Sequence, residues 1–176
     1  EIRYFWEEAA AKVREWKFPK LSLRYRATRY LETKVARSAN QVITICQGLR
    51  DDLISRGINS SKIYCIPNGV DANKFHPTRK DPELLEKHNL NGCFIIGFIG
   101  AFYRYEGIEY IIRALPRIMR SHPNIKVVLV GGGEELGAQK EKARLEALSA
   151  QLGVRDRVIF TGRVPYSEIV RYYSIM

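Results

Sequence analysis

Glycines and a cation follow two apolar runs near the middle of the chain, and together they have the chemistry of a phosphate site. The run 94–100 ends in a glycine, with Arg104 shortly after it, and the run 127–130 leads directly into the glycines 131–133. Glycine lets backbone N–H groups approach a ligand closely. Arginine adds a charge and a fork of donors that match phosphate oxygens. We therefore expect an anion to bind where these two runs end.

The pattern around these glycines is that of a strand, a helix and a second strand. Both apolar runs are typical of strands buried on both faces of a parallel sheet. Between them, apolar residues recur at helical spacing over 108–119. A charged helix is expected over 141–151 and a third buried strand over 158–164. Parallel αβ units bind ligands at the carboxyl ends of their strands, which is where the glycines stand.

The residues before position 71 predict a second αβ region. We expect helices over 22–38 and 48–56, the latter closed by Gly57 in a left-handed conformation. Strands are expected over 39–46 and 62–66 because β-branched residues gather there.

A turn joins the two regions. Pro67 fixes φ and the Asn-Gly after it tolerates positive φ. Asp71 is expected to accept backbone hydrogen bonds from the next turn, and Phe75 to anchor that turn. We therefore predict one domain over 1–70 and another over 71–176.

The charge of the chain is uneven. The net charge is +10 over 176 residues, and nine Lys or Arg against two acids fall between Lys12 and Arg37, with aromatic residues interleaved. Such a stretch suits an anionic membrane surface, a lipid-phosphate acceptor or simply a solvated helical face. No nucleic-acid module can be read, so we expect no nucleic-acid partner. No apolar run approaches the roughly 20 residues of a transmembrane helix.

The cysteines and histidines give no metal pattern. Three widely spaced cysteines, Cys46, Cys65 and Cys93, indicate buried, reduced thiols and a cytoplasmic location. The histidines are scattered, and we expect all of them on the surface or in loops. The sequence therefore predicts no metal site.

Several motifs in order resemble the family-4, or group 1, glycosyltransferases. These are PNGVD with Phe75 and Pro77, then GFIGAFYRYEGIEYIIRA, VVLVGGG and VIFTGRVP. The YEG segment and the LET…TICQGLRDDL region are most similar to the branch associated with bacterial exosortase and exopolysaccharide loci. The resemblance implies the α/β GT-B architecture, in which two Rossmann-like domains face a cleft. Both domains would be incomplete here, and their unpaired strand edges would favour self-association.

The resemblance also implies a function. A retaining enzyme would move a sugar from a nucleotide-sugar to a polyprenyl-phosphate or glycan acceptor, without metal or cofactor. It would lie in the bacterial cytoplasm, at the inner face of the membrane. The catalytic glutamate pair of the family would lie beyond Met176, so the chain alone is expected to be inactive.

Residues carried over from the family fall into two groups. Many members place an Arg and a Lys-Gly where this sequence has Ala101 and Glu106, which leaves open whether the usual diphosphate clamp is weakened. On the acceptor side the resemblance nominates Arg3, Trp6 and Glu7. The expected donor-binding residues are Gly100, Tyr103, Arg104, Gly107, Gly131, Gly132, Gly133, Gly162, Arg163 and Val164.

Two other functions stay open at this point. Gly131, Gly133 and Gly137 approach the dinucleotide-binding fingerprint of an oxidoreductase, although the next strand ends in Thr-Gly-Arg rather than in an acid. The basic stretch Lys12–Arg37 would also suit a non-catalytic module that binds a membrane or nucleic acid.

Overall fold

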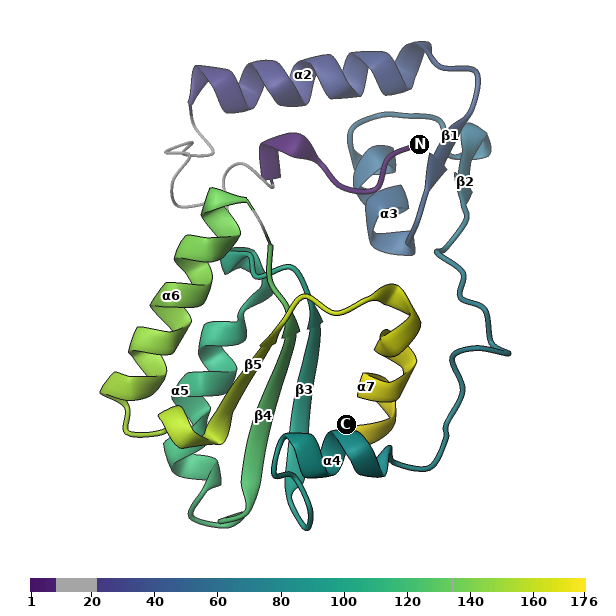
Figure 1. Ribbon diagram of the computed structural model, residues 1–176. Helices are drawn as coiled ribbons and strands as arrows, with labels where there is room; N and C mark the ends of the chain where they lie inside the picture. The colour runs from purple at the N-terminus through teal and green to yellow at the C-terminus, as the bar shows by residue number, and fades with distance from the viewer. Residues whose placement is uncertain (9–21, 134) are drawn as a thin grey trace. The chain divides into compact units, whose positions relative to one another are not determined.

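The computed structural model describes residues 1–8, 22–133 and 135–176. The chain divides into two compact units, Glu1–Val70 and Asp71–Met176, called here the first and the second unit. Each unit is α/β with a parallel sheet, as the sequence predicted (Figure 1).

The first unit pairs two short strands. Parallel β1 (Val42–Thr44) and β2 (Ile63–Cys65) are joined through α3 (Gln47–Ser55), and Ile2 forms a parallel bridge with Thr44. The long helix α2 (Leu23–Ser38) begins at Ser22, whose hydroxyl accepts a hydrogen bond from the Tyr25 N–H. Gly57 follows α3 with φ of 79°, which confirms the predicted left-handed position. Both predicted strands exist but are shorter than expected.

A small apolar core holds the first unit together. Its buried members come from the N-terminal segment, α2, both strands, α3 and the loop after α3. They are Phe5, Ala36, Val42, Leu53, Ile58 and Ile63.

The second unit is built on three parallel strands in the order β3-β4-β5. These strands span Phe94–Gly100, Ile125–Gly131 and Val158–Gly162. The helices are α4 (Pro82–Lys87), α5 (Ile108–Ile118), α6 (Leu136–Gln151) and α7 (Ile169–Ile175). Helix α6 begins several residues before the predicted start at 141.

Helices cover both faces of this sheet (Figure 1). On central strand β4, Val127 and Leu129 face the core shared with α5 and α6. Val128 and Val130 face the second core, shared with α4 and α7. All four side chains are fully buried, so β4 matches the prediction of a strand covered on both faces.

The two flanking strands also pack against both cores, but they are less completely buried than β4 because each has a neighbouring strand on one side only. β3 lies at one edge of the sheet, and its residues are exposed or half-buried, with Phe94 59% exposed. β5 lies at the other edge, where only Val158 is fully buried. Apolar composition alone does not reveal whether a strand has one neighbour or two.

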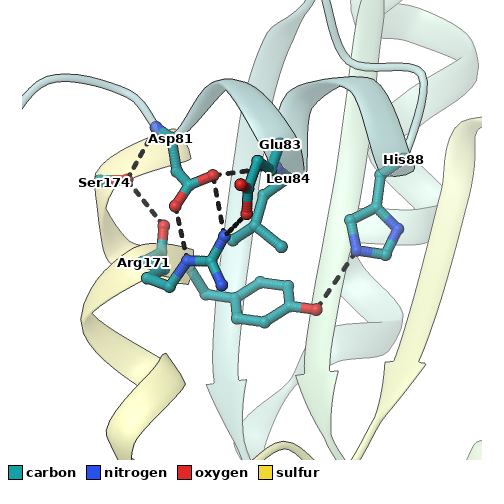
Figure 2. Close-up of polar contacts among 7 residues, drawn as sticks. Asp81, Glu83, Leu84, His88, Arg171 and Ser174 are labelled. Carbon is teal, nitrogen blue, oxygen red and sulfur yellow. Dashed lines mark hydrogen bonds and ion pairs between the residues drawn. The ribbon is translucent and has the colours of Figure 1, made fainter.

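A charged network fastens α7 to α4 (Figure 2). Arg171 on α7 donates from Nε to Asp81 at 2.6 Å and from Nη2 to Glu83 at 2.6 Å. Asp81 also caps α4 by accepting from the Leu84 N–H at 3.0 Å. These contacts, the Arg171 guanidinium first, hold the pKa of Asp81 below its ordinary value. The network therefore fixes the helix that follows β5.

The turn after the unit boundary follows its prediction. The Asp71 carboxylate accepts from the Asn73 N–H at 3.0 Å. The Phe75 ring contacts Tyr166 and Tyr173, with ring centroids 6.1 Å and 5.9 Å away. Phe75 thus anchors the start of the second unit on α7 and on the 3-10 turn that precedes it.

The cysteine prediction was half wrong. All three thiols are free, as expected, but Cys46 and Cys65 are exposed and Cys93 is half-buried. The reason is that Cys65 ends a strand of only three residues, Cys46 lies in the connection to α3, and Cys93 precedes an edge strand.

Candidate functional site

The glycine-ended strands of the second unit bring the predicted donor residues together at the carboxyl ends of the strands. The strands are parallel, so their carboxyl ends lie together. In the register, Gly100 stands opposite Gly131, and Val130 stands opposite Gly162. The chain therefore places three strand-end glycines in adjacent positions at these ends.

Packing also requires glycine at positions 131 and 133. Gly131 has φ of 116°, and a Cβ there would lie 2.2 Å from the Gly100 carbonyl oxygen. A Cβ on Gly133 would lie 2.6 Å from the Cβ of Ala138 on α6. The first two glycines of the dinucleotide-like pattern thus have a structural cause, and the third, Gly137, is exposed in the first turn of α6.

The loop between β3 and α5 carries the candidate cation. A single 3-10 turn spans Arg104–Glu106, and Gly107 then starts α5 in the left-handed conformation, with φ of 75°. Arg104 is exposed and forms no ion pair with any residue that the structure describes. The N–H groups of the first α5 turn and this guanidinium are the donors that an anion would find here.

The positions of the usual diphosphate clamp give no second cation. Ala101 follows β3 directly and is half-buried, and Glu106 is exposed at the end of the 3-10 turn. Arg104 is therefore the cation of this loop.

The third loop lies at the end of β5. Gly162 has φ of 74°, and its carbonyl accepts from the Thr161 hydroxyl at 2.9 Å. Arg163 is exposed, whereas Val164 packs against the core formed with α4 and α7. Of the nominated residues here, Arg163 presents a polar side chain to solvent and Val164 does not.

The acceptor-side residues lie in the first unit and differ in environment. Arg3 is exposed and pairs with Glu1 at 2.9 Å, and Trp6 is 58% exposed. Both line a pocket of about 540 Å³ between residues 1–6 and α2. Glu7 does not line this pocket; it is fully buried, with its carboxylate 2.7 Å from Nη1 of Arg56.

A buried charged cluster in the first unit was missed by the sequence reasoning. Arg56 pairs with Glu7 and Asp52, each at 2.7 Å, and lies 3.6 Å above the Phe5 ring. Glu32 accepts from the Trp6 N–H at 3.2 Å. Burial first, and then a hydrogen bond with Glu7, raise the pKa of Glu32 from 4.5 to about 7. Glu7, Glu32 and Arg56 are far apart in sequence, so no local motif relates these three residues.

The basic stretch Lys12–Arg37 is described only from residue 22 onward; residues 12–21 fall outside the described part. Helix α2 carries its remaining cations, all of them exposed. Exposed apolar side chains lie among them, including Leu23 at 84% and Val35 at 68%. None of the helices in the described ranges has the length and hydrophobicity needed to cross a bilayer. Within the same ranges, no cluster of His, Cys, Asp and Glu could hold a metal ion.

Comparison with solved structures defines the fold. Anabaena HepE, crystallised with UDP and glucose, superposes with a TM-score of 0.72 at 22% identity, over 89% of this chain and 42% of HepE. A glycosyltransferase from Rickettsia africae gives a TM-score of 0.66 at 22% identity, over 81% of this chain and 39% of its own. The fold is that of the GT-B glycosyltransferases.

Comparison of sequences defines the family. The family model described as group 1 glycosyl transferases matches residues 80–176, and the one described as glycosyltransferase family 4 matches residues 6–74. A glycosyltransferase of Methanocaldococcus jannaschii is 32% identical over 144 residues, which are 76% of this chain and 34% of that protein. A GDP-mannose-dependent phosphatidylinositol monomannoside mannosyltransferase of Mycolicibacterium smegmatis is 25% identical over 146 residues, 81% of this chain and 36% of the relative.

The chain belongs to the group 1 glycosyltransferases. It spans about a third of the length of these two relatives.

Proposed function

We propose that the chain is part of a retaining enzyme that transfers a sugar from a nucleotide-sugar to an acceptor, and that the second unit binds the donor. The observation that supports this most directly is the position of Arg104. Its guanidinium is exposed beside the start of α5, at the edge where the glycine-ended strands meet. A diphosphate there would accept hydrogen bonds from the guanidinium and from backbone N–H groups, and these would stabilise the charge that develops on the leaving group.

The names of related proteins support a nucleotide donor. HepE has been crystallised with UDP-glucose, and the mycobacterial relative is named for its use of GDP-mannose. Within the second unit we assign the donor to the three strand-end loops, with no metal and no cofactor. The proposed donor-binding residues are Gly100, Tyr103, Arg104, Gly107, Gly131, Gly132, Gly133, Gly162, Arg163 and Val164.

We further propose that residues 1–70 are the later part of the acceptor domain and that residues 71–176 are the first part of the donor domain. The two family models meet close to this boundary, which supports the division. Arg3, Trp6 and Glu7 would then belong to the acceptor side, where the pocket beside α2 receives part of the acceptor. The chain is expected to bind nucleotide through its second unit and to self-associate.

The acceptor that we favour is a polysaccharide or a lipid-linked phosphate, in the exosortase and exopolysaccharide branch. Several relatives have names that specify phosphorylated inositol acceptors, among them a D-inositol 3-phosphate glycosyltransferase of Nocardia farcinica. A lipid-linked acceptor would place the enzyme in the bacterial cytoplasm at the inner face of the membrane. Helix α2 is suited to that surface because exposed cations and apolar side chains occur together on it.

Titration calorimetry with UDP, GDP and ADP tests the donor site. We expect one nucleotide to bind the chain and the binding to weaken about tenfold or more in Arg104→Ala, because a charge-assisted contact to phosphate is lost. Arg120→Ala is the matched control, since Arg120 is also exposed but lies beyond the opposite end of α5. Equal affinity in the unmodified chain and Arg104→Ala would refute the assignment of this residue.

The membrane contact has its own test. Arg24→Glu combined with Arg26→Glu should abolish cosedimentation with vesicles that contain phosphatidylglycerol, because two attractive charges become repulsive. Vesicles of phosphatidylcholine alone serve as the control. Unchanged binding of the double variant to the anionic vesicles would rule out a membrane contact through these two cations of α2.

A further inference from the structure

A side-chain bridge joins two of the three loops at the candidate donor site. The Tyr103 hydroxyl, in the loop between β3 and α5, donates to Oε2 of Glu135 at 3.1 Å. Glu135 lies in the loop between β4 and α6. The two loops are also tied at their base, where the Gly132 N–H donates to the Gly100 carbonyl at 3.0 Å. The bridge therefore adds a second tie, made by side chains rather than by backbone.

Glu135 is placed for this contact rather than for capping its own helix. It immediately precedes α6 with an extended backbone, φ −62° and ψ 141°, yet its side chain makes no capping hydrogen bond. Its carboxylate instead accepts from Tyr103, across 32 residues of sequence. That contact raises the pKa of the Tyr103 hydroxyl. A tyrosine hydroxyl is protonated at neutral pH even at its ordinary pKa, so it can donate to the carboxylate.

The tyrosine is restrained from a second direction. Its ring stacks on Tyr105, with centroids 5.2 Å apart and planes 13° from parallel. Arg104 lies between these two tyrosines in sequence, at the start of the 3-10 turn. Because the residues on both sides of Arg104 are held, the backbone at Arg104 has fewer conformations. Less conformational entropy is then lost when an anion binds to its guanidinium.

We infer that Tyr103 and Glu135 are positioning residues for the nucleotide: their bridge holds the β3–α5 loop against the β4–α6 loop and so preorganises Arg104 for a diphosphate. The inference rests on the proposed donor site. It differs from the earlier assignment of Tyr103 as a donor-binding residue, because here Tyr103 acts through Arg104, and Glu135 is a new member of the site.

A double-mutant cycle on nucleotide affinity tests the inference. Tyr103→Phe keeps the ring stack and removes the donor, whereas Glu135→Gln keeps the shape and weakens the acceptor. Each change should raise the dissociation constant of the nucleotide that binds about threefold to tenfold, and the double variant should be no weaker than either single variant. Tyr173→Phe and Glu86→Gln are matched controls in the same unit. Both residues are exposed and lie outside the three loops.

Each other outcome points to a different error. Tighter binding by Glu135→Gln would mean that the carboxylate repels the diphosphate, and this would overturn the inference. Multiplied effects in the double variant would mean that the residues act independently, with Tyr103 touching the ligand itself. No nucleotide binding by the unmodified chain would contradict the donor site, and the inference would fall with it.

Hydrogen exchange separates a failure of the bridge from a failure of the site. In the chain without nucleotide, Tyr103→Phe should speed amide exchange in both loops, 101–107 and 132–136, while Tyr173→Phe should leave them unchanged. Unchanged exchange in both loops would show that the bridge does not hold them. That result would refute the inference even if nucleotide binding were intact.

Discussion

The carboxyl group of Glu32 should make the stability of the first unit depend on pH near neutrality. Glu32 lies on α2 next to buried Glu7, and Arg56 is shared by Glu7 and Asp52. Arg37 donates its hydrogen bond to the Arg56 carbonyl oxygen and not to a carboxylate. One guanidinium thus faces several acids. Burial and the contact with Glu7 favour a neutral Glu32, and its pKa rises to about 7.

The sign and size of the effect follow from that value. A pKa raised above 4.5 means that the folded unit binds the proton more tightly than the unfolded chain does. The stabilisation is complete below pH 4.5 and is lost as the pH rises through about 7. At about 1.4 kcal/mol for each tenfold change in proton affinity, the upper limit is about 3 kcal/mol. Glu32 keeps some contact with water, so we expect about 1–2 kcal/mol.

Tryptophan fluorescence is the suitable assay because Trp6 lies in the first unit and residues 71–176 contain no tryptophan. Urea unfolding at about pH 5 and about pH 8 gives the free energy of unfolding of that unit at each pH. The unmodified chain should lose about 1–2 kcal/mol more than Glu32→Gln does over this interval. Glutamine keeps an oxygen for the Trp6 N–H but cannot ionise. Asp51→Asn, at an exposed position, is the control.

Parallel pH profiles for the unmodified chain and Glu32→Gln would refute the reasoning, because they would show that Glu32 has the same proton affinity in both states. A uniform loss of stability in Glu32→Gln at both pH values would instead assign the role of Glu32 to its contact with the Trp6 N–H. Comparison of the two proteins cancels other groups that titrate in the interval, including the histidines, which all lie in the second unit.

Two further predictions concern the second unit. Gly131→Ala should lower the free energy of unfolding of this unit by more than about 2 kcal/mol, because the new methyl group meets the Gly100 carbonyl at positive φ. The control Gly137→Ala, in an open helical position, should be neutral or stabilising. Equal effects of the two variants in thermal unfolding would contradict this account. Arg171→Met should speed amide exchange in α7 and leave exchange in α5 unchanged, because the contacts to Asp81 and Glu83 are lost. Unchanged exchange in α7 would show that the apolar core alone holds this helix.

Much of the fold could be predicted from sequence because its determinants are local. A run of β-branched and aliphatic residues defined β4, and glycines marked the strand ends. The Asp71 turn and the left-handed Gly57 follow from backbone and side-chain chemistry within a few residues. The motif order then indicated the family, which the family models confirm over 80–176 and 6–74.

What could not be predicted depends on neighbours distant in sequence. The edge positions of β3 and β5 are a property of the sheet and not of either strand. The cluster of Glu7, Glu32 and Arg56 forms only when the N-terminal segment, α2 and the residue after α3 come together. Exposure of the cysteines likewise follows from which elements end beside them. The type of a residue indicates how often it is buried in proteins in general, whereas its burial in this chain is decided by tertiary contacts.

The two long helices that start at the strand-end loops are not equivalent as anion sites, and their first residues explain why. Both expose N–H groups at an N-terminus, where a negative charge is favoured. At α6 the residue before the helix is Glu135, whose carboxylate accepts from the Tyr103 hydroxyl instead of capping the helix, so a diphosphate bound at this N-terminus would lie close to a negative charge. At α5 the residue before the helix is Gly107, with no side chain, and Arg104 lies one turn earlier. The first-turn Glu109 of α5 is itself paired with Arg113 and Arg144, at 2.8 Å and 2.7 Å, so its charge is compensated. Electrostatics therefore favours α5 for the phosphates and leaves the glycines at the end of β4 to shape the loop beside it.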